Sequence, residues 1–207
     1  MNLKSVFKIN LNIAGVDEVG RGSLIGPVYA SAVILKKECD IKKLKDSKQL
    51  TKKKREILNK YIKKNSYWSI ASASKKEIEK LNILNATLLA MQRAIKKLKK
   101  KPKIVLIDGN RIPKMKNYNL KYVIKGDEKI PEISAASIIA KQTRELEIEK
   151  LKMQIGDFGS GYPSDERTIK FLKSYFNDNS KWPSGTRKSW KTIERIRPVK
   201  KLSDFGD

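Results

Sequence analysis

The acidic residues are the scarce chemical groups of this 207-residue chain, which has 47 Lys and Arg against 22 Asp and Glu and a formal net charge of +25. It contains no histidine and one cysteine, Cys39. That composition excludes zinc fingers, an intramolecular disulfide, a Cys–His nucleophile and a Ser–His–Asp triad. Any metal must be held by oxygen ligands, and carboxylates favour Mg²⁺ or Mn²⁺ over Zn²⁺. The acids are therefore the candidates for chemistry.

One segment, Gly15-Val-Asp-Glu-Val-Gly-Arg-Gly22, concentrates two acids, an arginine and three glycines just before an apolar run. It is not a dinucleotide-binding fingerprint, because Ile25 stands where that motif needs a glycine. It is not a P-loop either, because Arg21-Gly22 stands where Lys and then Ser or Thr is required. The glycines expose the backbone, so that N–H groups and Arg21 could meet a phosphodiester or a sugar edge.

Two further acids follow short apolar runs. Asp108 comes directly after Lys103–Ile107, and Asp127 follows Tyr122–Ile124 and Gly126. If these runs are strands of one sheet, four acids can meet at one edge: Asp17, Glu18, Asp108 and Asp127. A carboxylate cluster of this kind can hold two metal ions and hydrolyse a phosphodiester. Taken singly, the Asp-Gly and Gly-Asp pairs are equally typical of turns.

Asp17 and Glu18 are neighbours on a predicted strand, which limits whether both can face one site. Neighbours on an ideal strand point to opposite faces, so both acids reach one site only if the strand ends or bulges there. The glycines that follow are compatible with either.

The elements that must position these acids alternate between strands and helices. The predicted strands are Ile13–Val16 and Val28–Leu35, which form a hairpin, then Tyr67–Ala73, Lys103–Ile107 and Tyr122–Ile124. The predicted helices are one capped by Thr51 with Ile57, Leu58, Tyr61 and Ile62 on its apolar face, then Leu81–Leu98, Pro131 to about Gln154, Ile169–Phe176 and Trp190–Ile196. The small residues of Ser134–Ser137 should let their helix approach the sheet closely. This order predicts a mixed α/β domain with helices on the sheet faces.

The basic composition and the absence of long apolar runs indicate what the protein binds and where in the cell it is expected. Part of the +25 charge is a solvated lysine coat, and the rest is expected to meet phosphate. No apolar run approaches the ~20 residues of a membrane span, and no signal peptide opens the chain. We expect a cytoplasmic protein, a monomer, with a catalytic domain over residues 1–155 and a C-terminal helical extension over residues 156–207 packed on the same domain.

At this point the motifs carry a resemblance. The chain resembles ribonuclease HII, the type 2 ribonuclease H family, through these segments in order: Asp17-Glu-Val-Gly-Arg-Gly22, Asp46-Ser-Lys48, Leu81-Asn-Ile-Leu84, Ile107-Asp-Gly-Asn110, Lys125-Gly-Asp127 and Ser134-Ala-Ala-Ser-Ile138. The resemblance runs from about Ile13 to Pro198. It implies a ribonuclease H-like fold with a C-terminal helical extension. It also implies an endonuclease that cuts the RNA strand of RNA–DNA hybrids and acts at single ribonucleotides embedded in duplex DNA.

The resemblance assigns roles residue by residue. Asp17, Glu18, Asp108 and Asp127 match the family's metal-site acids, which implies a two-metal site for Mg²⁺ or Mn²⁺. Gly20, Arg21 and Gly22 match the loop that reads the ribonucleotide 2′-OH, and Tyr162 matches the tyrosine that senses the step from RNA to DNA. Ser47 and Lys48 are candidates for backbone phosphate. Residue chemistry alone favours Tyr162 as a half-buried turn aromatic between Gly161 and Pro163, and its position in the family pattern reverses that reading.

The resulting hypothesis is metal-assisted, in-line attack by water on the phosphate 5′ to a ribonucleotide, leaving a 3′-hydroxyl and a 5′-phosphate. The expected partners are RNA–DNA hybrid and ribonucleotide-containing duplex DNA, in ribonucleotide excision repair. A sliding clamp is left open as a partner, although Leu202–Asp207 shows no clear clamp-binding peptide.

Two alternatives remain open. One is a non-catalytic RNA-binding or ribosome-associated protein, which explains the charge but not the acids. The other is a ribonuclease H-like nuclease for DNA junctions, which would ignore the 2′-OH.

Overall fold

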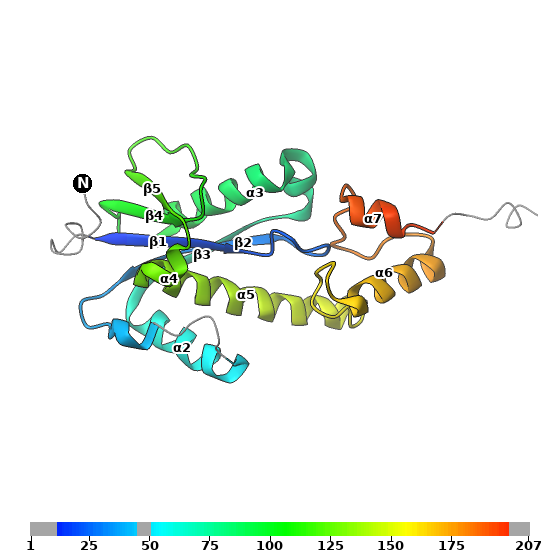
Figure 1. Cartoon of the computed structure of the whole chain (residues 1–207), viewed down its shortest axis with the longest axis horizontal. Helices are drawn as coiled ribbons and strands as arrows, with labels where there is room; N and C mark the ends of the chain where they lie inside the picture. The colour runs from blue at the N-terminus through cyan, green and yellow to red at the C-terminus, as the bar shows by residue number, and fades with distance from the viewer. Residues whose placement is uncertain (1–11, 45–50, 199–207) are drawn as a thin grey trace, which may run out of the picture.

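A five-stranded mixed sheet forms the centre of the computed structural model, which describes residues 12–44 and 51–198 (Figure 1). The strand order is β3-β2-β1-β4-β5. The strands are β1 (Ile13–Val19), β2 (Val28–Leu35), β3 (Ser66–Ala73), β4 (Ile104–Asp108) and β5 (Leu120–Val123). β1, β2 and β3 pair antiparallel, whereas β4 runs parallel to β1 and β5 parallel to β4. The predicted mixed α/β class is confirmed.

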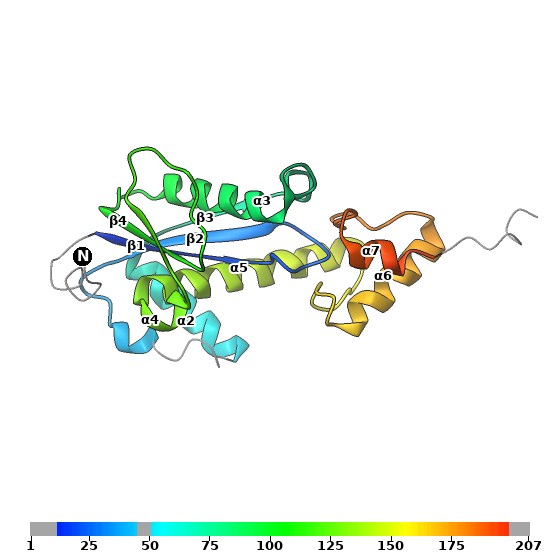
Figure 2. The same cartoon turned by 45° about the horizontal axis from the view of Figure 1, so that its top comes forward.

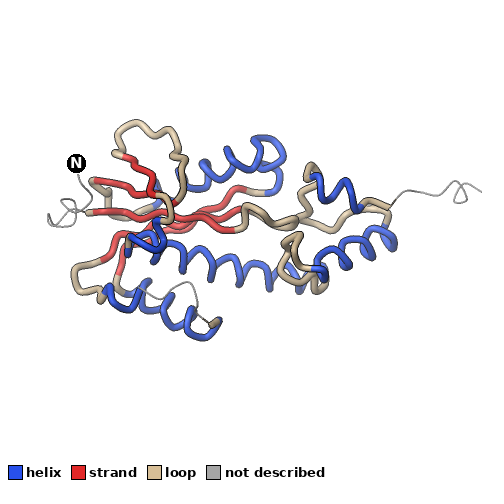
Figure 3. Tube along the Cα trace, viewed as in Figure 1, coloured by secondary structure: helices blue, strands red, loops and turns tan. Residues whose placement is uncertain are grey.

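Helices cover both faces of this sheet (Figures 1 and 2). α3 (Lys75–Lys97) lies on one face, and α2 (Lys52–Lys64) and α5 (Pro131–Ile155) lie on the other. The remaining helices are η1 (Ile41–Leu44), α4 (Gly126–Lys129), α6 (Glu166–Asn179) and α7 (Lys191–Ile196). α6 and α7 lie beyond one end of the sheet, as the tube in Figure 3 shows. Within the described residues, no helix is long and apolar enough to cross a membrane.

Helix α5 packs closely on β1 because small residues meet at their contact. A Cβ added to Gly15 would lie 2.1 Å from the carbonyl carbon of Glu132, so only glycine fits there. Ala135 and Ala136 on the facing side of α5 are fully buried. The close approach predicted from the small residues of this helix is confirmed, as is its start at Pro131, a residue that suits a first helical turn.

Two helices differ from their predicted form. α3 begins six residues before Leu81, because Ser74 and Glu77 form a reciprocal capping box at its N-terminus. This helix is interrupted at Asn82, whose φ of 66° is non-helical. In α2, Thr51 caps the helix as predicted, but Ile57 is 62% exposed and does not belong to the buried face.

The C-terminal segment packs on the loop between β1 and β2. Leu24 and Ile25 of that loop share an apolar cluster with residues from the end of α5 onward: Ile148, Phe158, Leu172 and Ile193. The backbone N–H of Leu24 donates to the carbonyl of Gly161 at 2.7 Å, and Ile25 forms an isolated β-bridge with Thr186. The loop that follows the paired acids is therefore built jointly by the N-terminal hairpin and the C-terminal segment.

Candidate active site

The parallel pairing of β1 with β4 brings two of the predicted acids to the same edge. Val16 pairs with Ile107, so the next residues of the two strands, Asp17 and Asp108, are neighbours. β1 ends at Val19, one residue after Glu18, and its register with β2 runs without a bulge. Glu18 and Val19 are still paired with β2, so the strand neither ends nor bulges between the two acids and the predicted condition is not met. Their approach is shown instead by the charge of Glu18 acting on Asp17 and by that of Asp108 acting on both.

Asp108 is tied to the segment that carries the fourth acid. Its Oδ1 accepts a hydrogen bond from the backbone N–H of Gly126 at 2.6 Å. A Cβ on Gly126 would lie 2.5 Å from Ile133 and 3.3 Å from that same oxygen, so glycine permits the contact. Asp127 is the next residue, and it lines a cavity of about 300 Å³ beside the first turn of α5.

The predicted strand-end position of Asp127 is wrong. β5 ends at Val123, and Asp127 lies in the first turn of α4. The chain leaves the sheet because Lys125 adopts the left-handed conformation (φ 54°), which turns the backbone into α4.

Burial and mutual repulsion act on the acids of this edge. Asp17 is 7% exposed, and burial, followed by the charges of Glu18 and Asp108, raises its pKa to about 7 against the lowering effect of the Ser137 hydroxyl. Burial likewise raises the pKa of Glu18, and Asp108 adds to the rise. The Arg21 guanidinium, 3.2 Å from Glu18 Oε1, opposes it. The edge thus holds more negative charge than its single arginine neutralises.

The donor chemistry of this edge fits hard divalent cations. Over the described ranges, no three Asp, Glu or Cys side chains are close enough to form a closed metal cluster. Mg²⁺ does not require one, since it is commonly bound through one or two carboxylates and completes its shell with water and substrate phosphate. Asp17, Glu18 and Asp108 supply carboxylates that already repel one another, and a cation between them relieves that repulsion.

The Gly20–Gly22 loop is held from behind by a buried arginine, Arg187. Its Nη1 donates to the carbonyl of Arg21 and its Nη2 to the carbonyl of Gly20, both at 2.7 Å. Its Nε donates to the carbonyl of Gly26 at 2.9 Å. Burial lowers the pKa of Arg187 to about 10, which still leaves it charged at neutral pH. Hydrogen bonds from a charged donor contribute about 1.5–3 kcal/mol each, so this contact stabilises the loop strongly.

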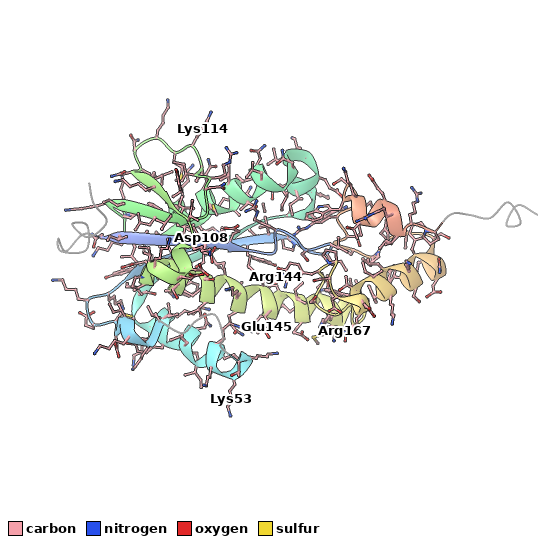
Figure 4. The ribbon with its side chains drawn as sticks, viewed as in Figure 1. Lys53, Asp108, Lys114, Arg144, Glu145 and Arg167 are labelled. Carbon is pink, nitrogen blue, oxygen red and sulfur yellow. The ribbon has the colours of Figure 1, made fainter. Side chains whose placement is uncertain are left out.

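Tyr162 lies against the same loop. A Cβ on Gly22 would sit 3.7 Å from its ring, and the guanidinium carbon of Arg144 lies 4.5 Å from the ring centroid. Arg144 also donates from Nη2 to the Ser23 hydroxyl at 3.1 Å and to the Ser160 carbonyl at 2.9 Å. Arg144 belongs to α5, and Figure 4 labels it on the side of that helix that faces the strands. The structure therefore brings Gly20, Arg21, Gly22 and Tyr162 together, and the Arg21–Glu18 pair joins them to the carboxylates.

A basic cavity of about 340 Å³ opens next to Arg144. Its cationic lining consists of Arg55, Lys141, Arg144, Lys152 and Arg167, with Glu145 and Glu149 as the acids. Lys141 is an exposed member of this lining. Ser47 and Lys48, the predicted phosphate contacts, lie outside the described residues.

Sequence reasoning missed Arg144 and Arg187 as parts of the site. A usable signal was present: only 9 of the 47 basic residues are arginines. In a lysine-rich chain, each arginine is a candidate for a place that needs a planar, multi-donor fork rather than a point charge.

Comparison with known proteins decides the family. The sequence profile described as Ribonuclease HII matches residues 14–193. The chain belongs to the ribonuclease HII family. It is 64% identical over 167 residues to the ribonuclease HII of Pelagibacter ubique, covering 79% of this chain and 89% of that protein. Ribonuclease HII of Neisseria meningitidis serogroup B is 50% identical over 167 residues, 78% of this chain and 86% of that protein.

Solved structures agree with the ribonuclease HII assignment. The ribonuclease H2 of Pyrococcus horikoshii OT3 superposes with a TM-score of 0.78 at 36% identity, covering 89% of this chain and 96% of that one. The ribonuclease HII of Archaeoglobus fulgidus, solved in complex with PCNA, gives 0.80 at 36% identity, covering 93% and 100%. A Bst ribonuclease HIII, solved with Mn²⁺, shares the fold at 17% identity and a TM-score of 0.70, covering 94% and 71%. The chain is thus a ribonuclease H-like hydrolase that acts on RNA in RNA–DNA hybrids.

Proposed function

We propose that this ribonuclease HII cleaves on the 5′ side of ribonucleotides, both in RNA–DNA hybrids and at single ribonucleotides within duplex DNA, leaving 3′-hydroxyl and 5′-phosphate ends. The observation that carries the proposal is that the carboxylates and the glycine loop lie next to each other. Electrostatically coupled carboxylates lie at the end of β1, and the Arg21–Glu18 ion pair joins them to a glycine loop packed on Tyr162. Cleavage chemistry and ribose recognition would then meet at the segment from Asp17 to Gly22.

In this proposal Asp17, Glu18, Asp108 and Asp127 hold the divalent cations, Mg²⁺ or Mn²⁺. Two such ions, when bound, would supply electrophilic stabilisation of the phosphate and an activated water. The chain has no histidine to act as a base, so its own part is to hold these carboxylates in place. The Gly126 N–H does so for Asp108. Asp17 has to give up its proton before it can bind a cation, because burial raises its pKa to about 7.

Ribose recognition is assigned to Gly20, Arg21, Gly22 and Tyr162. Only the 2′-OH distinguishes a ribonucleotide within DNA, and a glycine loop can bring backbone groups within hydrogen-bonding distance of it. The Tyr162 ring can stack on the sugar or base of the adjoining nucleotide. The lining of the basic cavity, with five cations and two acids, supports contact with the phosphate backbone.

We further propose that residues 1–155 form the catalytic domain and residues 156–207 an extension packed on it, as the shared apolar cluster of Leu24, Ile25 and Phe158 supports. A cytoplasmic monomer that acts in ribonucleotide excision repair is consistent with this function. A sliding-clamp partner is left open, since Leu202–Asp207, which shows no clear clamp-binding peptide, lies outside the described residues.

The test is cleavage of a labelled DNA duplex with one ribonucleotide, beside an identical all-DNA duplex, in Mg²⁺, in Mn²⁺ and in EDTA. We expect a single cut 5′ to the ribonucleotide in either metal, none in EDTA, and none in the all-DNA duplex. Cutting of the all-DNA duplex would favour a junction nuclease that ignores the 2′-OH. Binding of both duplexes without cleavage in either metal would overturn the proposal.

A further inference from the structure

We propose that Arg187 is a positioning residue that sets the discrimination between ribose and deoxyribose, by holding the Gly20–Gly22 loop in its reading conformation. This inference rests on the proposed function of that loop. Arg187 would touch neither substrate nor metal. It would act through the backbone carbonyls to which its side chain is hydrogen-bonded.

The contact is built for one shape of the loop. A single guanidinium, fully buried, reaches three carbonyls, of Gly20, Arg21 and Gly26, at 2.7–2.9 Å. Its own backbone N–H donates to the carbonyl of Leu24 at 2.9 Å. Within the described residues no carboxylate forms an ion pair with Arg187, so these carbonyls are what compensates its buried charge. Movement of the loop would leave that charge unsolvated.

The loop does little to fix its own shape. Gly20 has a φ of +89°, and Gly22 is a second glycine, which has no side chain to pack against the Tyr162 ring beside it. In the part of the chain that the structure describes, the backbone hydrogen bond inside residues 20–23 is a long one, from Ser23 N–H to the Gly20 carbonyl at 3.3 Å. Glycine-rich segments lose more conformational freedom on ordering than others. The order of this loop therefore has to come from outside it, and Arg187 supplies it.

Only arginine can make this contact. The carbonyls are reached by three different nitrogens, Nε, Nη1 and Nη2, whose planar geometry is fixed. Lysine retains the charge but offers one nitrogen on a flexible stem. Arg187→Lys thus keeps the positive charge and removes the planar set of three hydrogen-bond donors. Arg195→Lys is the matched control, because Arg195 is exposed on α7 in the same segment.

The experiment measures two affinities on each protein preparation in EDTA, where no cleavage occurs. One duplex contains a single ribonucleotide, and the other is the same sequence in DNA. The ratio of the two dissociation constants is the readout, because partial unfolding lowers both apparent affinities equally and leaves the ratio unchanged. We expect Arg187→Lys to lower this ratio by about tenfold or more, the effect of losing hydrogen bonds to a charged donor, and Arg195→Lys to leave it at the wild-type value.

The outcomes are distinct. If the wild type prefers the ribonucleotide duplex and Arg187→Lys prefers it equally, the role of Arg187 is wrong and the proposed function stands. If the wild type shows no preference and cuts neither duplex in Mg²⁺ or Mn²⁺, the proposed function fails and this inference fails with it. Should Arg187→Lys not fold, Trp190→Leu keeps an apolar side chain against the cluster of Leu24 and Ile25 and removes the ring that lies 5.3 Å from the guanidinium. It is expected to lower the same ratio by a smaller factor, and an unchanged ratio there would contradict the inference.

Discussion

The carboxylate edge and the Gly20–Gly22 loop are joined by the Arg21–Glu18 ion pair. They differ in whether their polar groups have partners within the protein. At the carboxylate edge, formed by Asp17, Glu18 and Asp108, negative charges lie close together and the pKa values of Asp17 and Glu18 are raised. In the loop, the carbonyls of Gly20 and Arg21 are satisfied by a charged donor at 2.7 Å. The carboxylates therefore repel one another as long as no cation lies between them, whereas the loop is already ordered without substrate.

This difference matches what each region is proposed to bind. Metal ions bring their own large charge, so repulsion among their ligands is relieved on binding and adds to affinity. A 2′-OH brings no charge, and its recognition depends on donors and acceptors already in place. Substitutions should therefore affect the two regions differently: the edge through chemistry and charge, the loop through selectivity.

The largest effect is expected from Asp108→Asn. The amide oxygen can still accept from Gly126 N–H, so the fold should survive, while the charge proposed to bind metal is lost. We expect initial rates on an RNA–DNA hybrid in Mg²⁺ to fall about a thousandfold or more. Glu166→Gln, which changes the net charge equally at an exposed side chain, is the control and should stay within about twofold of wild type. A rate for Asp108→Asn near that of the control would remove Asp108 from the reaction.

The second effect is on stability. Burial raises the folded-state pKa of Asp17 to about 7, above the ordinary value of 3.8 for an aspartate. The protein without metal is therefore stabilised below about pH 4 and loses that contribution as pH rises through 7. Asp17→Asn should therefore unfold at a higher temperature than wild type at pH 8, by the equivalent of about 2–4 kcal/mol, and at a similar temperature at pH 4. Calorimetry in EDTA measures both values.

Added Mg²⁺ sharpens the same test. It should raise the melting temperature of the wild type at pH 8 more than that of Asp17→Asn, because ligands that bind the folded state stabilise it. A variant less stable than wild type at pH 8 in EDTA would show that Asp17 is a structural acid rather than a strained metal ligand.

The third prediction separates two glycines of the loop. Gly20 has a φ of +89°, and a Cβ there would lie 3.2 Å from the Pro27 carbonyl, so Gly20→Ala should destabilise the protein by about 1–2 kcal/mol. A Cβ on Gly22 would meet only the Tyr162 ring, at an ordinary 3.7 Å. Gly22→Ala should therefore keep its stability within about 0.5 kcal/mol.

The functional effect of Gly22→Ala is expected on the substrate side. Its methyl group would occupy the space that substrate approaches, and cleavage at a single ribonucleotide should fall about tenfold or more. Thermal melts and single-ribonucleotide cleavage of the two variants, side by side, make the measurement. If Gly22→Ala cleaves as wild type does, the loop does not contact the ribose at that point.

Much of the sheet was predictable because each strand is marked by the residues within it and directly beside it in the sequence. Alternating or continuous apolar runs between glycines and prolines located all five strands, and the capping residue Thr51 and Pro131 located two helix starts. The start of α3 was missed because a polar capping box, rather than apolar periodicity, sets it. Asp127 was misplaced because a left-handed Lys125 has no sequence signature like that of glycine.

The candidate site was predictable in its acids and not in its arginines. Asp17, Glu18 and Asp108 stand out as rare charges beside strands. Arg144 and Arg187 act across more than 120 residues of sequence, on Ser23 and on Gly20. Such contacts depend on how the C-terminal segment packs against the hairpin loop, which periodicity along the chain does not encode.

The smallest effect is expected at the Tyr162 hydroxyl, and it tests whether the loop region works by shape or by polar contact. In the described part of the chain the Tyr162 side chain makes no hydrogen bond, and its ring lies 4.5 Å from the Arg144 guanidinium carbon. Tyr162→Phe keeps the ring and should cleave the single-ribonucleotide duplex within about twofold of wild type, whereas Tyr162→Leu should lose about tenfold through stacking.

Tyr67→Leu, at an aromatic residue on the edge strand β3, is the control for loss of a ring elsewhere and should match wild type. Initial rates of the three variants on one duplex decide the matter. A large loss in Tyr162→Phe would mean that the hydroxyl itself contacts the substrate. Tyr162 would then resemble the acids of the carboxylate edge, whose polar groups lack a compensating partner in the protein, more than the Gly20–Gly22 loop, whose carbonyls already accept hydrogen bonds.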